Sequence, residues 1–145
     1  MEKNYDALKL CNQLCFPLYA CSRETIKLYK PWLDRLDLTY TQYITLMVLW
    51  ECKSTTVKAL GHELYLDSGT LTPLLKKLEE KGLVTRRRST EDERNLIVTI
   101  TEAGEALKDD ALHIPAEMTK SVNLTHDEAI ELYRLLYKML EIVKK

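Results

Sequence analysis

The chain has 145 residues, a length that suits one domain with a sizeable core. Hydrophobic residues make up 46% and charged residues 30%, and there are only 4 Gly and 4 Pro. This composition excludes a disordered, collagen-like or loop-rich disulfide-scaffold protein. The sequence has no run of about 18 apolar residues and no signal-peptide layout at its start. We therefore expect a cytoplasmic protein with no membrane partner, whose 4 cysteines are thiols.

Charge is distributed unevenly around a net value of −1. Residues 53–94 carry nine positive and seven negative side chains, whereas residues 102–145 carry six and nine. The densest positive point is Arg86-Arg87-Arg88. A mildly basic middle can direct the field of the protein towards one surface, although short charge runs are usually only solvated.

The first segment shows apolar residues at helical spacing that include Cys15. Asn12 is a candidate N-cap for this helix. Because the ring of Pro17 is tolerated only in a first turn, the helix either starts near residues 13–15 or kinks there. Both versions place Cys15 close to a helix N-terminus.

A capping box at residues 39–42 opens an apolar helix over residues 44–50, which Cys52 would end as a core residue. We expect a break at 53–55 and a short helix over 57–64. A turn at 65–69 then leads into a helix with one apolar stripe, formed by Leu71, Leu74, Leu75 and Leu78.

Gly82 has the character of a helix-terminating glycine. Residues 83–87 and 96–101 are predicted strands, and the polar stretch between them forms the turn of a hairpin. Thr101 can cap a further helix, which Pro115 interrupts or ends. A second capping box at residues 125–128 opens a final apolar helix.

A short helix, a tight turn, a helix and a hairpin in this order indicate a winged helix-turn-helix, in a fold that is mainly α with a small β-hairpin wing. If the leucine stripe faces the core, small hydroxyl and basic groups face outward, as entry into a DNA major groove requires. The alternative is an ordinary amphipathic helix with a solvated face. The residues predicted to bind double-stranded DNA are Ser68, Thr70, Thr72, Pro73, Lys76, Lys77, Arg86, Asp92 and Arg94.

The sequence resembles the MarR family of bacterial winged-helix repressors over nearly its whole length. The matching motifs are Leu66-Asp67-Ser68-Gly69-Thr70-Leu71-Thr72-Pro73-Leu74-Leu75, Gly82-Leu83-Val84, Asp92-Glu93-Arg94 and Thr99-Ile100-Thr101-Glu102-Ala103-Gly104. Two further stretches look like the branch of organic hydroperoxide resistance regulators. They are Leu14-Cys15-Phe16-Pro17-Leu18-Tyr19-Ala20 and Leu38-Thr39-Tyr40-Thr41-Gln42-Tyr43.

The resemblance implies a homodimeric repressor that binds an inverted-repeat operator until a cysteine is oxidised by an organic hydroperoxide. It implies a single MarR-type domain over residues 1–145. In that domain, interlocked dimerisation helices occupy about 1–38 and 106–145, and the DNA-binding lobe occupies about 39–105. The apolar final helix independently favours a homodimer.

Cys15 is the candidate redox sensor, because a helix N-terminus favours the thiolate over the thiol. Tyrosine hydroxyls can donate hydrogen bonds to a thiolate, and Tyr19 lies one turn further along the predicted helix. The resemblance implies that Tyr29 and Tyr40 approach the sensor across the dimer interface. The alternative is that Cys15 is a small core residue on an apolar stripe.

The fate of oxidised Cys15 stays open between over-oxidation, a bridge with Cys11 and a mixed disulfide with a low-molecular-weight thiol. No cysteine follows Cys52, and the resolving cysteine of some branch members lies in the C-terminal third. This favours the low-molecular-weight thiol or over-oxidation. The chain departs from the expected pattern at Pro17, where a small or aliphatic residue is expected, and at Thr41, where proline is expected.

Two other functions compete with a thiol-switched repressor. One is a repressor of the same fold that a small aromatic ligand releases from DNA, with Cys15 inert. The other is a thiol peroxidase, which would leave the DNA-reading pattern unexplained. The histidines show no metal-ligand spacing, and there is no phosphate-binding or dinucleotide motif. We therefore predict no metal, no cofactor and no enzymatic activity.

Overall fold

Side-chain caps explain where most of the helices begin. In the computed structural model, which describes residues 3–144, α2 (Tyr40–Cys52) follows Thr39, whose hydroxyl accepts a hydrogen bond from the Gln42 amide. The Gln42 side chain in turn accepts one from the Thr39 amide. Thr125 and Glu128 make the same reciprocal arrangement at the start of α7 (His126–Val143). Both predicted capping boxes are confirmed.

Three more helices begin with a side-chain oxygen that accepts a hydrogen bond from the backbone amide three residues further on. They are α3 (Val57–Leu64) after Thr56, α4 (Ser68–Glu80) after Asp67, and α5 (Glu102–Ala111) after Thr101. The next helix, α6 (Ile114–Val122), carries Pro115 as its second residue. Proline is tolerated there because first-turn amides have no partner within the helix. The chain therefore breaks between α5 and α6, just before this proline.

The first helix, α1 (Cys15–Leu33), begins without a side-chain cap. Leu14 occupies the cap position, so the predicted cap at Asn12 is wrong. Asn12 lies in a 3₁₀ turn, and its Nδ2 donates instead to the Asp6 carbonyl oxygen at 2.7 Å. Pro17 is the third residue of α1, inside the first turn, so the helix starts at Cys15 and is not kinked by this proline. Cys15 is thus the first helical residue.

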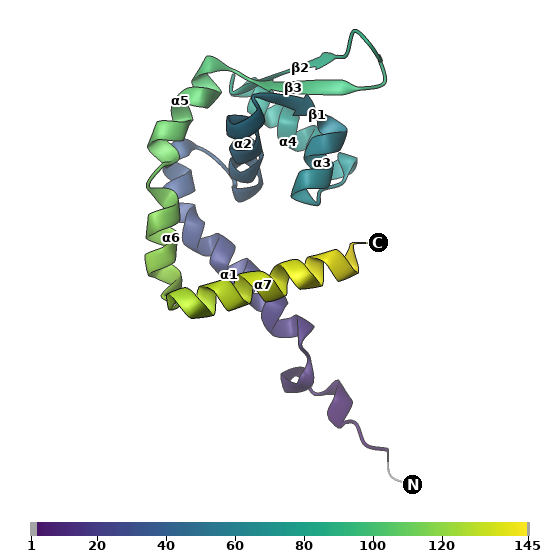
Figure 1. Ribbon diagram of the computed structural model, residues 1–145, viewed down its shortest axis with the longest axis vertical. Coiled ribbons are helices and arrows are strands. Elements are labelled where there is room, and N and C mark those ends of the chain that lie inside the picture. The colour runs from purple at the N-terminus through teal and green to yellow at the C-terminus, as the bar shows by residue number, and fades with distance from the viewer. Residues whose placement is uncertain (1–2, 145) are drawn as a thin grey trace. The chain divides into compact units, whose positions relative to one another are not determined.

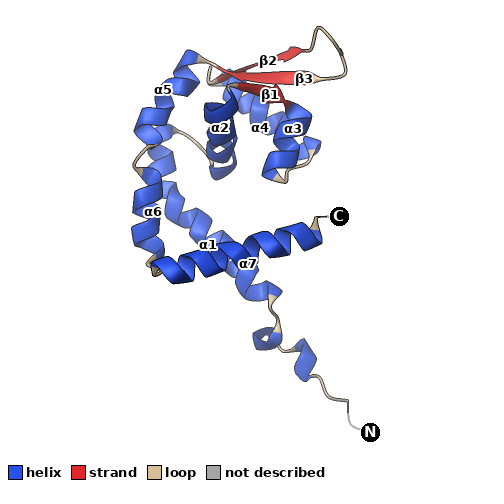
Figure 2. Cartoon of the chain, viewed as in Figure 1, coloured by secondary structure: helices blue, strands red, loops and turns tan. Residues whose placement is uncertain are grey.

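The sheet has three antiparallel strands in the order β1-β3-β2, as Figure 2 shows in red. They are β1 (Ser54–Thr56), β2 (Val84–Arg88) and β3 (Leu96–Ile100). The hairpin of β2 and β3 is confirmed, with Val84 opposite Ile100. The helix break predicted at 53–55 is confirmed, because α2 ends at Cys52 and α3 begins at Val57. The strand within this break was not predicted: Ser54 pairs with Thr99 and Thr56 with Ile97. A strand of three residues has too few positions to show an alternating pattern.

The sheet lies across one end of α2, α3 and α4 (Figure 1). The largest fully buried side chains come mostly from these helices and from the hairpin, and include Leu46, Leu49, Leu60, Leu71, Leu75, Leu78, Val84 and Val98. The predicted leucine stripe of α4 is confirmed as its buried face. Cys52 does not join this core as predicted. It is the last residue of α2 and is exposed.

Trp50 of α2 and Gly104 of α5 meet where the hairpin joins the helices. The indole Nε1 of Trp50 donates to the Gly104 carbonyl oxygen at 2.9 Å, in a buried position. A Cβ atom on Gly104 would overlap the Leu83 carbonyl oxygen and would lie 2.7 Å from Ile100 Cγ1. This contact therefore admits glycine only. Nearby, Thr101 Oγ1 donates to the carbonyl oxygen of Gly82, whose φ of +74° favours glycine.

The chain divides into two compact units, residues 1–114 and 115–145. In the second unit, α7 has no buried residue. Its exposed apolar side chains are Ile130, Leu132, Tyr133, Leu135, Tyr137, Ile142 and Val143. The rings of Tyr133 and Tyr137 lie against each other, with centroids 4.4 Å apart. An amphipathic helix with this much exposed apolar surface is typical of an interface.

We expect Gly104→Ala to lower the free energy of unfolding by about 1–3 kcal/mol, because the added methyl group meets backbone atoms that cannot move aside. Urea denaturation followed by circular dichroism measures this change. Gly69→Ala is the matched control: its Cβ would meet only the Asp67 carboxylate, at 3.1 Å, and alanine is favoured in a helix. Equal unfolding free energies for the two variants would contradict the assignment of Gly104 as a packing constraint.

Candidate nucleic-acid interface and sensor cysteine

The outward face of α4 carries hydroxyl and cationic groups. Asp67 starts the helix by accepting a hydrogen bond from the Thr70 amide at 2.8 Å. Because the leucine stripe faces the core, the opposite face is open to solvent. All six of the residues predicted there to bind DNA are exposed: Ser68, Thr70, Thr72, Pro73, Lys76 and Lys77. This face offers donors for phosphate and base edges and has no bulky side chain to hinder entry into a groove.

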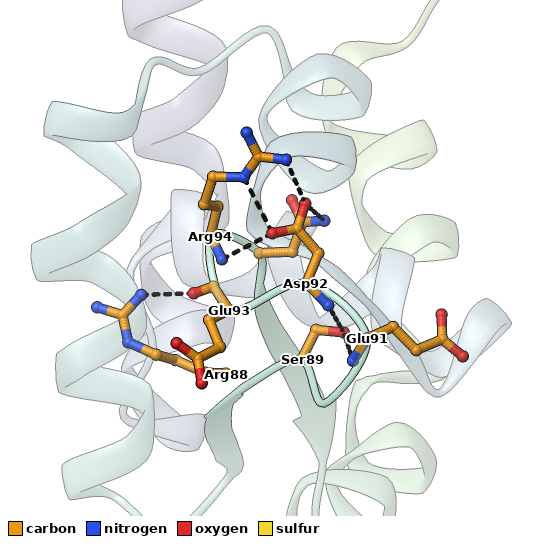
Figure 3. Close-up of polar contacts among 7 residues, drawn as sticks. Arg88, Ser89, Glu91, Asp92, Glu93 and Arg94 are labelled. Atoms are coloured by element: carbon orange, nitrogen blue, oxygen red, sulfur yellow. Dashed lines mark hydrogen bonds and ion pairs between the residues drawn. The ribbon is translucent and has the colours of Figure 1, made fainter.

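Arg94 lies beyond the turn of the β2–β3 hairpin and is held by Asp92 (Figure 3). Asp92 Oδ1 accepts hydrogen bonds from the Arg94 amide at 3.1 Å and from its Nε at 3.0 Å, and Asp92 Oδ2 accepts one from Nη2 at 3.1 Å. The Arg94 side chain and then its amide hold the pKa of the Asp92 carboxyl below its usual value. The Arg94 side chain is nevertheless 89% exposed. Its guanidinium is therefore oriented in advance while staying open to solvent.

The hairpin turn itself is held by polar contacts, also drawn in Figure 3. Ser89 Oγ accepts hydrogen bonds from the amides of Glu91, at 3.2 Å, and Asp92, at 3.4 Å. Arg88 Nη1 donates to the Glu93 carbonyl oxygen at 2.8 Å. These contacts order a loop that would otherwise lose conformational entropy on binding.

Arg86 is directed towards α4. Its Nε and Nη2 donate to Glu79 Oε2 at 3.1 and 2.9 Å, and its amide donates to Glu79 Oε1 at 2.9 Å. The side-chain and backbone hydrogen bonds from Arg86 hold the pKa of the Glu79 carboxyl below its usual value. Only 19% of the Arg86 side chain is exposed. DNA contact by Arg86 stays a prediction, and nothing in the sequence pattern pointed to Glu79.

Two hollows lie beside α4 among the described residues. The first, of about 500 Å³, has apolar walls that include Val57, Leu66 and Leu96 and a rim that includes Lys58 and Arg94. The second, of about 470 Å³, lies where the residues after α1 approach α4. It is lined by Asp34, Asp37, Leu38, Thr39, Gln42, Lys77 and Lys81. Ligand pockets are mostly apolar, whereas the lining of the second hollow is mainly charged and polar. This hollow therefore gives little support to the alternative of a repressor that a small aromatic ligand releases from DNA.

Cys15 is exposed and occupies the first position of α1. Leu14 supplies no side-chain acceptor, so the first-turn amides of Cys15 and Phe16 have no side-chain cap. Pro17 has no amide hydrogen to donate. Cys15 is therefore accessible to solvent in this chain, and it is not the core residue of the alternative interpretation.

The predicted supporting tyrosines form two separate groups. Tyr19 Oη accepts a hydrogen bond from Arg23 Nη1 at 2.9 Å, one turn further along α1. The rings of Tyr29 and Tyr40 lie 4.9 Å apart between centroids, and that of Tyr43 lies 6.0 Å from Tyr29. Arg23 and Tyr43 were not singled out by the sequence pattern. The i, i+4 spacing of Tyr19 and Arg23 is the signal that could have found Arg23.

Burial keeps the phenol groups of the second group protonated. Burial raises the pKa of Tyr29 and Tyr40, and the nearby Tyr40 raises that of Tyr29 further. Both hydroxyls are therefore hydrogen-bond donors throughout the neutral range. In one chain, however, Tyr29 lies 14 residues along α1 from Cys15, about 21 Å at 1.5 Å per residue. The structure does not bring Cys15 to this pair within a single chain.

The other thiols are also exposed. Cys11 lies in a 3₁₀ turn that precedes α1, so it does not share a helix with Cys15. Among the described residues, no group of three or more His, Cys, Asp and Glu side chains is arranged to hold a metal ion. No helix within residues 3–144 has the length and apolar character to cross a membrane.

Comparison with known proteins assigns a family. The family model for the transcriptional regulators SarA and Rot matches residues 27–111. The organic hydroperoxide resistance transcriptional regulator of Bacillus subtilis is 50% identical over 141 residues, which cover 97% of this chain and 96% of the relative.

Solved structures agree with this assignment. Reduced AbfR bound to DNA superposes with a TM-score of 0.78 at 35% identity, covering 97% of this chain and 98% of that chain. Overoxidised AbfR has also been crystallised bound to DNA, and a disulfide-formed AbfR superposes with a TM-score of 0.67. A MarR mutant of Escherichia coli complexed with operator DNA gives 0.82 at 26% identity, covering 96% and 99%.

The proteins named here are transcriptional regulators, and the prediction of a non-enzymatic winged helix-turn-helix protein is confirmed. The chain belongs to the SarA/Rot-type, MarR-like family of winged-helix transcriptional regulators, beside the organic hydroperoxide resistance regulators.

Proposed function

We propose that the protein is a homodimeric repressor that binds an inverted-repeat operator and is released when an organic hydroperoxide oxidises Cys15. The observation that carries the proposal is an exposed, uncapped helix-start thiol in the same chain as a DNA-reading surface of α4 and a hairpin. The Bacillus subtilis relative, named for organic hydroperoxide resistance, supports the signal. Binding to the chromosome would place the protein in the cytoplasm.

The DNA contacts follow from the shape of the surface. The exposed hydroxyls and lysines of α4 suit the major groove, about 12 Å wide, and Arg94 suits the narrower minor groove. Asp92 acts through Arg94, because its carboxylate holds the guanidinium in one orientation. The DNA-bound structures of AbfR and of the MarR mutant support this mode of binding.

A second copy of the chain accounts for two features. The exposed apolar side chains of α7, together with Phe16, Leu18, Ile26 and Leu28 of α1, give each chain apolar surface that a partner can bury. In addition, about 21 Å separates Cys15 from Tyr29 along α1, so Tyr29 and its neighbour Tyr40 could support the Cys15 thiolate only from the other copy. The sensor would then be complete only in the dimer.

The chemistry begins with attack of the Cys15 thiolate on a peroxide oxygen. The sulfur–oxygen bond forms as the oxygen–oxygen bond breaks. The sulfenic acid keeps the hydrogen of the peroxide, and the leaving alkoxide takes up one proton from solvent to become an alcohol. A low-molecular-weight thiol then displaces water to form a mixed disulfide. Because overoxidised AbfR is found on DNA, we favour this bulkier adduct as the form that leaves the operator.

Homodimer formation is the first test. The chain is expected to sediment as a dimer at micromolar concentration, because α7 alone exposes seven large apolar side chains. Tyr133→Glu and Ile130→Glu place charges on that face and should shift sedimentation towards the monomer. A monomeric profile for the wild-type chain would contradict the proposal.

The sensor is tested by operator binding with and without an organic hydroperoxide and a small thiol, using a duplex that the reduced chain selects from a random-sequence pool. Cys15→Ser should keep the affinity and lose the release, because serine preserves the size but cannot form a sulfenic acid. Cys11→Ser, Cys21→Ser and Cys52→Ser are the matched controls and should still be released. Release of Cys15→Ser at the wild-type peroxide concentration would assign the response to another group.

The tyrosine pair is tested by reaction rate. Tyr29→Phe and Tyr40→Phe should slow oxidation of Cys15 by peroxide, because each removes a hydroxyl that can donate to the thiolate and keeps the ring packing. Since burial raises the pKa of both phenols, their contribution should be constant across neutral pH. Stopped-flow measurements under excess peroxide give the rates. Wild-type rates in both variants would remove the pair from the sensor.

A further inference from the structure

Glu79 and Arg86 join the last turn of α4 to the edge of the sheet. One carboxylate accepts three hydrogen bonds, two from the Arg86 guanidinium and one from its backbone amide, at 2.9–3.1 Å. The two residues are seven positions apart and lie on either side of the turn at Gly82. A carboxylate held by a guanidinium fork is restrained in direction as well as in distance.

The position of Glu79 is unfavourable for α4 alone. A negative charge in the last turn of a helix faces the negative end of the helix dipole. Glu79 therefore gains its stabilisation from outside the helix, through Arg86. The neighbouring Glu80 shows the contrast, since its nearest charged partner is Lys76 on the same helix, at 4.0 Å.

The backbone contact has a separate effect on the sheet. β2 is an edge strand, because the strand order is β1-β3-β2. The Arg86 amide donates to Glu79, so the carboxylate supplies an acceptor that an edge strand otherwise lacks. Glu79 thus holds both the backbone and the side chain of one residue in the middle of β2.

The middle of β2 is also the base of the hairpin that carries Arg94. The turn begins at Ser89, three residues beyond Arg86, which corresponds to about 10 Å of extended chain. A rotation of about 15° at the base would then move the tip by about 2.6 Å, close to half the width of a minor groove of about 6 Å. A small change in how the hairpin is held against α4 is therefore enough to misplace the arginine.

We propose that Glu79 and Arg86 form a clamp that fixes the hairpin against α4 and so sets operator affinity, with neither side chain contacting DNA. The proposal rests on the operator binding proposed above. Its competitor is a direct phosphate contact by Arg86. The low exposure of the Arg86 side chain and the hydrogen bonds from its Nε and Nη2 to Glu79 argue for the clamp.

The direction in which one substitution changes DNA affinity distinguishes the clamp from a simple effect of charge. Glu79→Gln removes a negative charge near DNA, which by charge alone would strengthen binding. The clamp predicts the reverse, a loss of about tenfold. Glu79 uses both carboxylate oxygens as acceptors, whereas glutamine has only one, so its NH2 group would face either the guanidinium or the Arg86 amide. Glu80→Gln is the matched control, with the same charge change on the adjacent exposed residue, and should bind at least as tightly as wild type.

Arg86→Lys separates the clamp from a phosphate contact. Lysine keeps the charge, so it would preserve a phosphate contact, but it cannot form the guanidinium fork. The clamp predicts that Arg86→Lys and Glu79→Gln each lose affinity, and that the double variant loses less than the product of the two factors, because both changes act on the same contact. The salt dependence of binding should keep its wild-type slope in all three, whereas Arg94→Ala should reduce it by about one.

The measurement is fluorescence anisotropy of full-length chains with the selected operator duplex, at four salt concentrations. Wild-type affinity for Arg86→Lys with a reduced slope for Arg86→Gln would overturn the clamp in favour of phosphate contact. Tighter binding by Glu79→Gln would overturn it in favour of charge alone. Glu79→Asp, which keeps the charge but shortens the reach, should lose affinity while circular dichroism stays that of the folded chain.

Failure of the proposed function gives a different result. If the wild-type chain selects no duplex from the random pool, operator binding itself is wrong. The clamp would then still be visible in the amide signal of Arg86 in nuclear magnetic resonance spectra. That signal should follow titration of the Glu79 carboxyl in wild type and should not do so in Glu79→Gln. An Arg86 amide indifferent to pH in wild type would overturn the contact itself.

Discussion

The contact between the Trp50 indole and the Gly104 backbone is the constraint on which the DNA-reading elements depend. It brings the end of α2 to the first turn of α5, where the hairpin returns to the helices. Thr101 ties the same point to the Gly82 turn that follows α4. Because Gly104 has no room for a side chain, α5 can approach the Leu83 backbone directly. The positions of α4 and of both ends of the β2–β3 hairpin therefore depend on this one small junction.

Burial in α4 also determines which chemistry faces solvent. Four leucines are committed to the core, so the rotation of the helix about its axis is fixed. The hydroxyls and lysines on the other face then project together, because the packing of the leucines determines which way that face points. At the start of α1 the opposite condition applies: no cap and no burial leave Cys15 at an open helix end. The solvent face of α4 is thus positioned by packing of its other face, whereas Cys15 is accessible because nothing in this chain packs over it.

The features that could be predicted from the sequence are local. Capping boxes at Thr39 and Thr125, the stop at Gly82 and the leucine stripe each depend on neighbours within one or two turns. The features that were missed depend on partners distant in sequence. β1 exists only because Ser54 lies opposite Thr99, and Glu79 matters only because the chain returns past it at Arg86. The expected burial of Cys52 failed for the same reason, since the position of a helix end in the core is set by what packs beyond it.

The pairing of Arg94 with Asp92 has a consequence for how such a protein searches DNA. At distances well beyond the ion pair, the positive charge of Arg94 is cancelled by the negative charge of Asp92. Glu91 and Glu93 add further negative charge to the turn. The hairpin therefore contributes little to the long-range, sequence-independent attraction that slows a protein on every stretch of duplex. In the operator complex proposed above, the hairpin would contribute at short range, where a narrow groove concentrates negative potential enough to outweigh the carboxylate. It would thereby shorten unproductive residence on the rest of the chromosome and favour sites whose groove has the right shape.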